Sequence, residues 1–344
     1  MKLRNKKLAN PFIYQGYESP EYFCDREAET KTLMSHLKNG RNVTLISPRR
    51  LGKTGLIKNT FYHLEKDEKD SACLYLDIFA TKNLHDFVEQ FGVMVINDIV
   101  RKNSSFIEKT IAFFSALRPV LSMDPLTGEP SVSITIEPSQ EDITIRSIFN
   151  YLNESGKEVY IAIDEFQQIG DFPDSLTFQK KLRSVWQLQS HVSYCLYGSK
   201  KHMMEQMFQN ASYPFYRFGD FFYLNKISEK DWVEYICQRF ESTGKHISEE
   251  LAREICQVTD RYSSYVQQLA WFVWLRVQDD SAATEEDLKY GIDRLLDACE
   301  PLFIQQTEDL SAYQMNFLHA IINGVHTGFT QTAILETYRL GTAA

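Results

Sequence analysis

The stretch 42-NVTLISPRRLGKTGLIKNTF-61 decides the fold of this 344-residue chain. Its first part, Asn42–Ser47, is apolar and β-branched, which predicts a buried strand. Its last part repeats apolar residues at helical spacing and predicts a helix over residues 55–66. The loop between them, Ser47–Thr54, joins the strand to the helix. In this arrangement the backbone N–H groups of the loop can surround a phosphate at the start of the helix.

The loop fits the pattern G-x-x-x-x-G-K-[ST], with Ser47 in place of the first glycine. A serine fits there only where the backbone avoids positive φ. Gly52 lets the backbone approach a phosphate, Lys53 supplies positive charge for the β- and γ-phosphate oxygens, and Thr54 supplies a hydroxyl ligand for Mg²⁺. Two further loop residues, Arg49 and Arg50, add charge beside the phosphates or form salt bridges at the sheet edge. The complete predicted nucleotide-binding loop is Ser47, Pro48, Arg49, Arg50, Leu51, Gly52, Lys53, Thr54 and Gly55.

A second apolar strand, residues 158–163, runs directly into Asp164 and Glu165. Asp164 is predicted to hold Mg²⁺, and Glu165 to orient or deprotonate an attacking water. Two carboxylates at the end of a buried strand are costly without a nearby cation, unless the strand end is simply solvated. Together with the phosphate loop, this pair predicts that the cofactors are ATP or ADP with Mg²⁺.

The rest of the chain divides into three parts. Strands expected at 72–79, 192–197 and 221–224 alternate with helices at 83–102, 105–117, 141–155 and 175–189, which predicts a parallel sheet with helices on both faces. A β-hairpin at about 119–136 is expected as a surface insertion. From residue 228 helical periodicity takes over, at 228–240, 248–258, 262–277 and 284–298, followed by short helices at 311–322 and 330–338. The predicted domains are 1–225 (α/β), 226–299 (helical lid) and 300–344.

The composition of the chain limits the partners and the cell compartment that we expect for it. The formal net charge is −9 and hydrophobic residues make up 43% of the chain, so no overall charge attracts nucleic acid or anionic membranes. No segment has 18 apolar residues in a row, and we expect no membrane span. The six cysteines form no CxxC pair, which favours neither a zinc site nor a disulfide framework and indicates a reducing cytoplasm.

These residues together resemble the bacterial and archaeal AAA-type P-loop ATPases of the STAND group, over nearly the whole chain. Asn10-Pro11-Phe12, followed by Phe23 and Arg26-Glu27, is similar to the family's N-terminal segment, which packs against adenine. The resemblance therefore implies nucleotide contacts for Pro11, Phe12, Phe23 and Arg26. The sequences SPRRLGKT and IDEFQ resemble the family's two phosphate and metal motifs.

The same resemblance implies further roles. Ser199, after the fourth strand, looks like the polar sensor position, and Arg217 looks like a γ-phosphate or sensor arginine. The predicted catalytic set is thus Lys53, Glu165, Ser199 and Arg217, with Thr54 and Asp164 at the metal. The family's lid carries a G-x-P turn, where this chain has Arg261-Tyr262-Ser263. Residues 300–344 resemble a partial winged helix.

The leading functional prediction is a slow ATPase that acts as a conformational switch in regulation or signalling, with an unidentified protein partner. One alternative is a nucleic-acid-associated ATPase that reads DNA through the C-terminal region, although Arg339 is the only Lys or Arg in residues 305–344. Another is a scaffold that binds ATP without turnover, which the altered turn favours. Oligomer formation is compatible with each of them.

Overall fold

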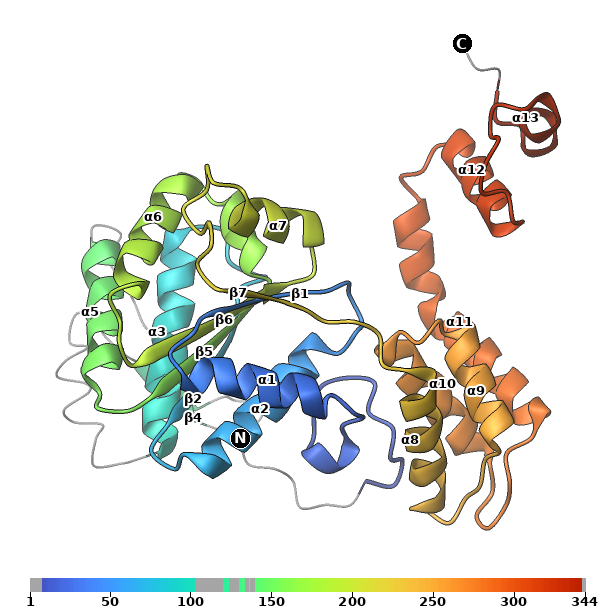
Figure 1. Cartoon of the computed structure of the whole chain (residues 1–344), viewed down its shortest axis with the longest axis horizontal. Coiled ribbons are helices and arrows are strands. Elements are labelled where there is room, and N and C mark those ends of the chain that lie inside the picture. The colour runs from blue at the N-terminus through green and yellow to red at the C-terminus, as the bar shows by residue number, and fades with distance from the viewer. Residues whose placement is uncertain (1–7, 103–119, 124–129, 134–135, 137–139, 342–344) are drawn as a thin grey trace.

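The computed structural model of this chain describes residues 8–102, 120–123, 130–133, 136 and 140–341. Its centre is a five-stranded parallel sheet with the strand order β2-β5-β6-β1-β7 (Figure 1). The strands are β1 (Val43–Ile46), β2 (Ala72–Asp77), β5 (Val159–Asp164), β6 (Val192–Gly198) and β7 (Asp220–Tyr223). This confirms the predicted fold class, a P-loop-type parallel sheet enclosed by helices.

Strand register brings three loops to one edge of the sheet. Strand β6 lies between β1 and β5, with Ile46 opposite Gly198 on one side and Ile163 opposite Leu196 on the other. All three strands are parallel, so their carboxyl ends meet at the same edge. The residues that follow them, from Ser47, Asp164 and Ser199 onward, therefore lie side by side although they are far apart in sequence.

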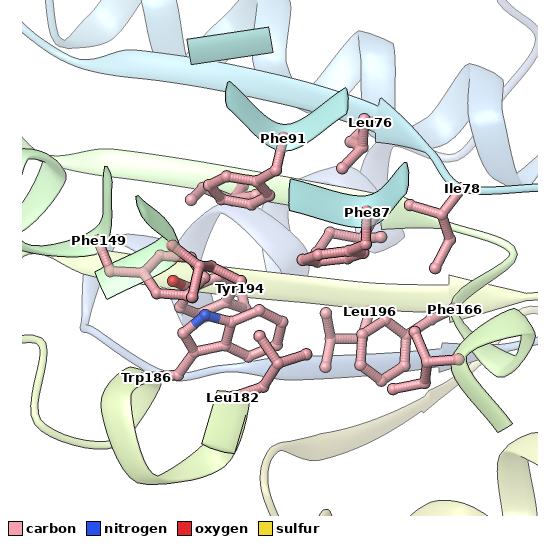
Figure 2. Close-up of a cluster of buried hydrophobic side chains, with 14 of the residues drawn as sticks. Leu76, Ile78, Phe87, Phe91, Phe149, Phe166, Leu182, Trp186, Tyr194 and Leu196 are labelled. Carbon is pink, nitrogen blue, oxygen red and sulfur yellow. The ribbon is translucent and has the colours of Figure 1, made fainter. Parts of the chain in front are cut away.

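Helices cover both faces of the sheet. One face packs on α1 (Glu27–Lys38) and α2 (Lys53–Asp67), and the other on α3 (Leu84–Lys102), α5 (Glu141–Glu154), α6 (Ser175–Trp186) and α7 (Lys201–Gln209). Alternate residues of each strand point to opposite faces. Tyr194 and Leu196 of β6 therefore enter the core beneath α3, α5 and α6, where Trp186 stacks on Tyr194 at 4.2 Å (Figure 2). The sheet is buried on both sides, as its continuous apolar strands predict.

Two details differ from the sequence prediction. Helix α7 was not predicted, although Met204, Met207 and Phe208 repeat at helical spacing and are buried; the segment is short, which weakens the signal. The antiparallel pair β3 (Val120–Met123) and β4 (Pro130–Ser133) confirms the hairpin, but β4 begins before the expected strand. The helix predicted at 105–117 lies outside the described residues.

The C-terminal half contains a set of helices that we call the helical bundle: α8 (Glu229–Glu241), α9 (Glu249–Val258), α10 (Ser263–Arg276) and α11 (Glu285–Thr307). Ser228, Ser248 and Thr284 begin three of these helices, each accepting a backbone N–H with its hydroxyl, as predicted. The expected end of α11 near residue 298 is wrong. The helix continues through Pro301, which removes one backbone donor without ending it.

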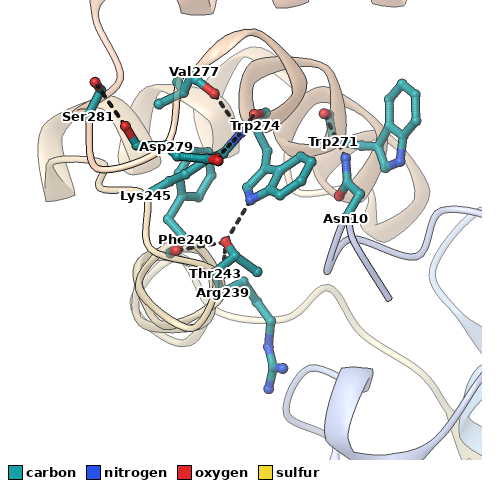
Figure 3. Close-up of polar contacts among 10 residues, drawn as sticks. All are labelled: Asn10, Arg239, Phe240, Thr243, Lys245, Trp271, Trp274, Val277, Asp279 and Ser281. Carbon is teal, nitrogen blue, oxygen red and sulfur yellow. Dashed lines mark hydrogen bonds and ion pairs between the residues drawn. The ribbon is translucent and has the colours of Figure 1, made fainter. Parts of the chain in front are cut away.

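A buried lysine fixes the end of α10. The ammonium of Lys245 donates to the carbonyl oxygens of Trp274 at 3.0 Å and Val277 at 2.5 Å, and lies 3.9 Å from the centre of the Trp274 ring (Figure 3). A cation at a helix C-terminus satisfies free carbonyls and opposes the helix dipole. Lys245 therefore has a structural role in the bundle.

Beyond the bundle, α11 extends toward α12 (Ala312–Ile322) and α13 (Thr332–Tyr338), which lie away from the sheet (Figure 1). Phe317 packs on Phe329 at 4.5 Å, and Ala320 is the buried residue of α12. Among the described residues, no helix combines the length and apolarity needed to cross a membrane.

Candidate nucleotide-binding site

A cavity of about 380 Å³ opens at the carboxyl edge of the sheet, between the sheet and the helical bundle. This volume is within the range of small-molecule sites. Four parts of the chain line it: the N-terminal segment (residues 13–26), the phosphate loop with the start of α2 (49–55), the ends of β5 and β6, and the bundle. Most of the predicted site residues meet here.

The phosphate loop has the backbone that its sequence requires. Ser47 does not have a positive φ, which is the condition under which a serine replaces the first glycine, whereas Arg50 and Gly52 have φ of 69° and 86°. The Lys53 ammonium donates to the carbonyl oxygens of Ser47 at 3.1 Å and Pro48 at 2.9 Å. Burial lowers the pKa of Lys53, while Asp164 and Glu165 act in the opposite direction. The loop thus holds a desolvated cation inside its curve.

Asp164 is the meeting point of three elements. Its Oδ2 accepts hydrogen bonds from Thr54 Oγ1 at 3.2 Å and from Tyr75 Oη at 3.0 Å, and its Oδ1 accepts from the Glu165 N–H at 2.8 Å. Burial raises the pKa of Asp164 above its ordinary value, and the nearby Asp77 adds to this effect. The buried carboxylate is therefore unfavourable as an anion until a cation approaches it. The pattern in sequence did not reveal Tyr75, since its partner lies 89 residues away.

Glu165 is held by Ser199, which directly follows β6, and by Gln167 in the helical turn after β5. Its Oε2 accepts from Ser199 Oγ at 3.0 Å, from the Ser199 N–H at 3.3 Å and from Gln167 Nε2. Burial acts to raise the pKa of Glu165, but the hydrogen bonds from Gln167 and Ser199 outweigh it, and the pKa is lowered. Gly198 leaves room for Gln167, because an added Cβ would lie 1.8 Å from Gln167 Oε1. Glu165 is thus held as a charged carboxylate at the cavity.

The two loop arginines diverge. Arg49 Nε donates to Ser199 Oγ at 3.1 Å, on the side of Glu165. The Arg50 guanidinium carbon lies 4.5 Å from the centre of the Tyr265 ring on α10. Among the residues that the structure describes, neither forms the salt bridge to the sheet edge that was the alternative interpretation.

The N-terminal segment contributes part of its predicted set. Phe23 and Arg26 line the cavity, and Arg26, which is 3% exposed, donates to the carbonyl oxygens of Leu51 and Asn225 at 3.4 and 2.6 Å. Phe12 does not line it. Its ring packs on Phe240 at 5.6 Å inside the helical bundle, and Pro11 is buried beside it. Pro11 and Phe12 thus belong to the bundle side, and the chain lines the cavity from Ile13 onward.

Arg217 lies away from the cavity. Its side chain is exposed, its guanidinium stacks 5.3 Å from the Tyr216 ring, and its N–H donates to the carbonyl of Phe208. Within one chain, the structure does not bring Arg217 to the phosphate loop.

The bundle adds residues that sequence reasoning did not assign. The Ser264 N–H donates to the carbonyl of Arg50 at 3.1 Å, and Gln267 Oε1 accepts from the Ile13 N–H at 3.2 Å. Gln267 Nε2 also donates to Tyr235 Oη at 3.2 Å, so this side chain links the N-terminal segment to two helices. Its position in the helix pattern gave no sign of these contacts.

The turn before α10 contains neither glycine nor proline. Asp260 and Arg261 have φ of 46° and 55°, the left-handed region that glycine favours. Ser263 is the first residue of α10, the position that proline favours. Arg261 and Ser263 therefore occupy backbone positions that glycine and proline would favour.

The donor set suits Mg²⁺ that arrives with a phosphate ligand. Among the residues that the structure describes, no group of three or more His, Cys, Asp or Glu side chains could hold a metal by itself. Mg²⁺ usually takes one or two protein oxygens and completes its shell with phosphates and water. Thr54 and Asp164, with their oxygens 3.2 Å apart, fit that requirement.

Comparisons with known proteins show the family and the fold of the chain. A family model described as an ATPase domain predominantly from Archaea matches residues 23–267. A Walker-type ATPase of Pyrococcus abyssi is 16% identical, with a TM-score of 0.66 over 96% of this chain and 87% of that one. The ORC1 protein of Aeropyrum pernix, solved in complex with DNA, is 11% identical with a TM-score of 0.57 over 93% and 79% of the two chains. At these identities the two structures show a shared fold. No curated protein sequence matches the chain.

Proposed function

The chain belongs to the family of ATPase domains found predominantly in Archaea, and from this membership we propose that it binds ATP with Mg²⁺ and hydrolyses it slowly. The observation that carries the proposal is the convergence of Lys53, Thr54, Asp164 and Glu165 on one cavity. A lysine inside a glycine loop, a hydroxyl next to a buried carboxylate, and a charged second carboxylate are the parts that phosphoryl transfer to water uses.

Each residue has a distinct role in this proposal. Lys53 binds the β- and γ-phosphate oxygens, and Thr54 and Asp164 hold Mg²⁺, which neutralises charge on the phosphates. Glu165 accepts a proton from the attacking water, which its lowered pKa allows at neutral pH. Ser199 orients Glu165 through the 3.0 Å hydrogen bond. Arg217 has no role within the same chain.

The base of the nucleotide is proposed to lie between the N-terminal segment and the bundle. Ile13, Tyr22, Phe23 and Trp232 give this end of the cavity apolar and aromatic walls. Gln267 closes it by joining Ile13 to Tyr235. Stacking on such walls suits a purine, while the loop at the other end suits the triphosphate.

The regulatory part of the proposal is a switch of the STAND type, in a cytoplasmic protein built from residues 1–225, 226–299 and a partial winged helix at 300–344. A ligand shifts a conformational equilibrium only when it contacts the two states differently. Residues of the bundle line the same cavity as the phosphate loop, so a change in their separation changes the contacts to nucleotide. We propose that hydrolysis resets this arrangement.

Turnover is tested by phosphate release from wild type, Lys53→Ala and Glu165→Gln. We expect slow release by wild type only, while Glu165→Gln still binds ATP, because it keeps the phosphate and metal ligands. Lys66→Ala is the matched control, an exposed lysine at the other end of α2, and we expect wild-type release from it. Equal phosphate release from Glu165→Gln and wild type would show that Glu165 takes no part in the reaction.

A further inference from the structure

Arg49 and Arg50 are adjacent in the phosphate loop but reach different partners. Arg49 donates to Ser199 Oγ, beside the catalytic carboxylate, whereas the guanidinium of Arg50 lies over the Tyr265 ring at 4.5 Å. This distance is within the range in which a cation is attracted by an aromatic face. Tyr265 belongs to α10, and it packs against the core of the helical bundle. Arg50 therefore joins the loop to the bundle.

The backbone of the loop is attached to α10 at the same place. The carbonyl of Arg50 accepts from the Ser264 N–H at 3.1 Å, and the carbonyl of Leu51 accepts from Ser263 Oγ at 3.4 Å. In a trans peptide the C=O and the following N–H point in opposite directions. These bonds therefore direct the N–H groups of Leu51 and Gly52 away from α10. Both residues line the cavity, where backbone N–H groups can bind a phosphate.

The pKa shifts of neighbouring groups also place the two arginines beside different partners. Burial raises the pKa of the Cys299 thiol on α11, and the positive charge of Arg50 acts against this rise, which places Arg50 near a second helix of the bundle. Burial lowers the pKa of Lys53, and the positive charge of Arg49 lowers it further, which places Arg49 near the phosphate-binding lysine.

We propose that Arg50 is a positioning residue, a latch that ties the phosphate loop to α10 through Tyr265, and that only Arg49 of the two faces the phosphates. The latch forms in the nucleotide-free protein; its consequence for ATP rests on the proposed function. Because α10 donates hydrogen bonds to the loop carbonyls, movement of the bundle changes the conformation of the loop. A ligand that holds the loop in one conformation therefore also restricts the position of the bundle. The loop itself is then the connection between nucleotide and bundle.

Amide hydrogen exchange of residues 262–267 in nucleotide-free protein tests the latch. Arg50→Met and Tyr265→Leu should each speed exchange at Ser264 by about two- to five-fold, the strength of a surface cation–π contact. The double variant should be no faster than either single variant, because both remove one interaction. Tyr265→Phe keeps the ring and should exchange like wild type, and Arg49→Met is the matched control that should also leave this exchange unchanged.

ATP affinity, measured in parallel, distinguishes the latch from a phosphate contact. The latch predicts that Arg50→Met and Tyr265→Leu weaken ATP binding by the same factor, again without addition in the double variant. Unchanged exchange in Arg50→Met, combined with a loss of ATP affinity as large as that of Arg49→Met, would overturn the proposal. If wild type does not bind ATP, the proposed function fails, while the exchange experiment still decides whether the latch exists.

Discussion

Thr54 Oγ1 lies 3.2 Å from Asp164 Oδ2, a hydrogen bond between residues 110 positions apart. It joins the start of α2, which follows β1, to the end of β5. In the sheet, β6 lies between these two strands. Tyr75 donates to the same oxygen. Asp164 is therefore surrounded by hydroxyl donors, yet its pKa is raised by burial. The fold would hold Asp164 more easily as a neutral group, so a cation beside the carboxylate would offset the cost of its burial.

Replacing Asp164 by Asn should stabilise the nucleotide-free protein and remove its response to Mg²⁺. A carboxyl whose folded pKa is raised contributes stability below its ordinary pKa of 3.8 and loses it as the pH rises through the folded pKa. At neutral pH the wild type therefore carries an unfavourable charge that Asn lacks. We expect a gain of roughly 0.5–2 kcal/mol in unfolding free energy, typical of residues kept for function.

Urea unfolding of both proteins at several pH values measures this difference. The advantage of Asp164→Asn should grow as the pH rises above 3.8 and then level off. Asp77→Asn, at the end of the neighbouring strand, should give a smaller gain in the same direction, because Asp77 adds to the raised pKa of Asp164. A variant less stable than wild type at neutral pH would contradict the account of Asp164.

Ser199→Ala should shift the pH dependence of ATP hydrolysis. The hydrogen bonds from Gln167 and Ser199 lower the pKa of Glu165, so removing the Ser199 hydroxyl raises it. A base must be ionised to act, and activity falls as the pH drops through its pKa. The acidic limb of the kcat profile should therefore move to higher pH in the variant. A limb at the wild-type position would show that Ser199 does not act through Glu165.

Arg261→Gly should stabilise the turn before α10. Arg261 has φ of 55°, where a side chain costs about 1–2 kcal/mol and glycine costs little. After the greater backbone entropy of glycine in the unfolded chain is subtracted, we expect a net gain of about 0.5–1 kcal/mol in thermal or urea unfolding. Arg261→Ala is the control, since it removes the guanidinium but keeps the Cβ. Equal stability of the Gly and Ala variants would refute strain at this position.

Gln267→Leu should weaken ATP and adenosine binding by the same factor. Gln267 contacts the N-terminal segment at the end of the cavity proposed for the base, one helical turn along α10 from Ser263 and Ser264, which hold the phosphate loop. Lys53→Met should weaken ATP much more than adenosine, since Lys53 serves the phosphates. Competition of both ligands with a fluorescent nucleotide measures the four affinities. If Gln267→Leu selectively weakened ATP, the assignment of the base to this end would be wrong.

The sequence was sufficient for the parts of the site that are local. Strand, loop and helix around Lys53 follow from about twenty consecutive residues, and Asp164 and Glu165 from the end of one strand. The hydroxyl caps at Ser228 and Ser248 were also readable, because a cap depends on three neighbouring residues. These features are short-range, so periodicity and residue type determine them.

Long-range contacts were not predictable in the same way. Tyr75 reaches Asp164 only because β2 pairs with β5, and Gln267 reaches Ile13 only because α10 packs on the N-terminal segment. Arg261 looked like a lost glycine, yet it adopts a positive φ, and its N–H donates to the carbonyl of Cys256 in the last turn of α9 at 2.9 Å. Phe12 shows the same limit, since the sequence alone did not distinguish a ring that contacts adenine from one buried in the bundle.

Calorimetric titration of the wild-type chain with ATP in the presence of Mg²⁺ tests whether the cavity binds nucleotide. We expect one ATP bound per chain at the cavity of Lys53 and Asp164, with binding reduced at least about tenfold, or 1.4 kcal/mol, in Lys53→Ala and unchanged in Lys66→Ala. At about 100 times its Kd, ATP should also raise the unfolding free energy by roughly 2.7 kcal/mol. Absence of binding and of stabilisation in folded wild-type protein would contradict the proposed function.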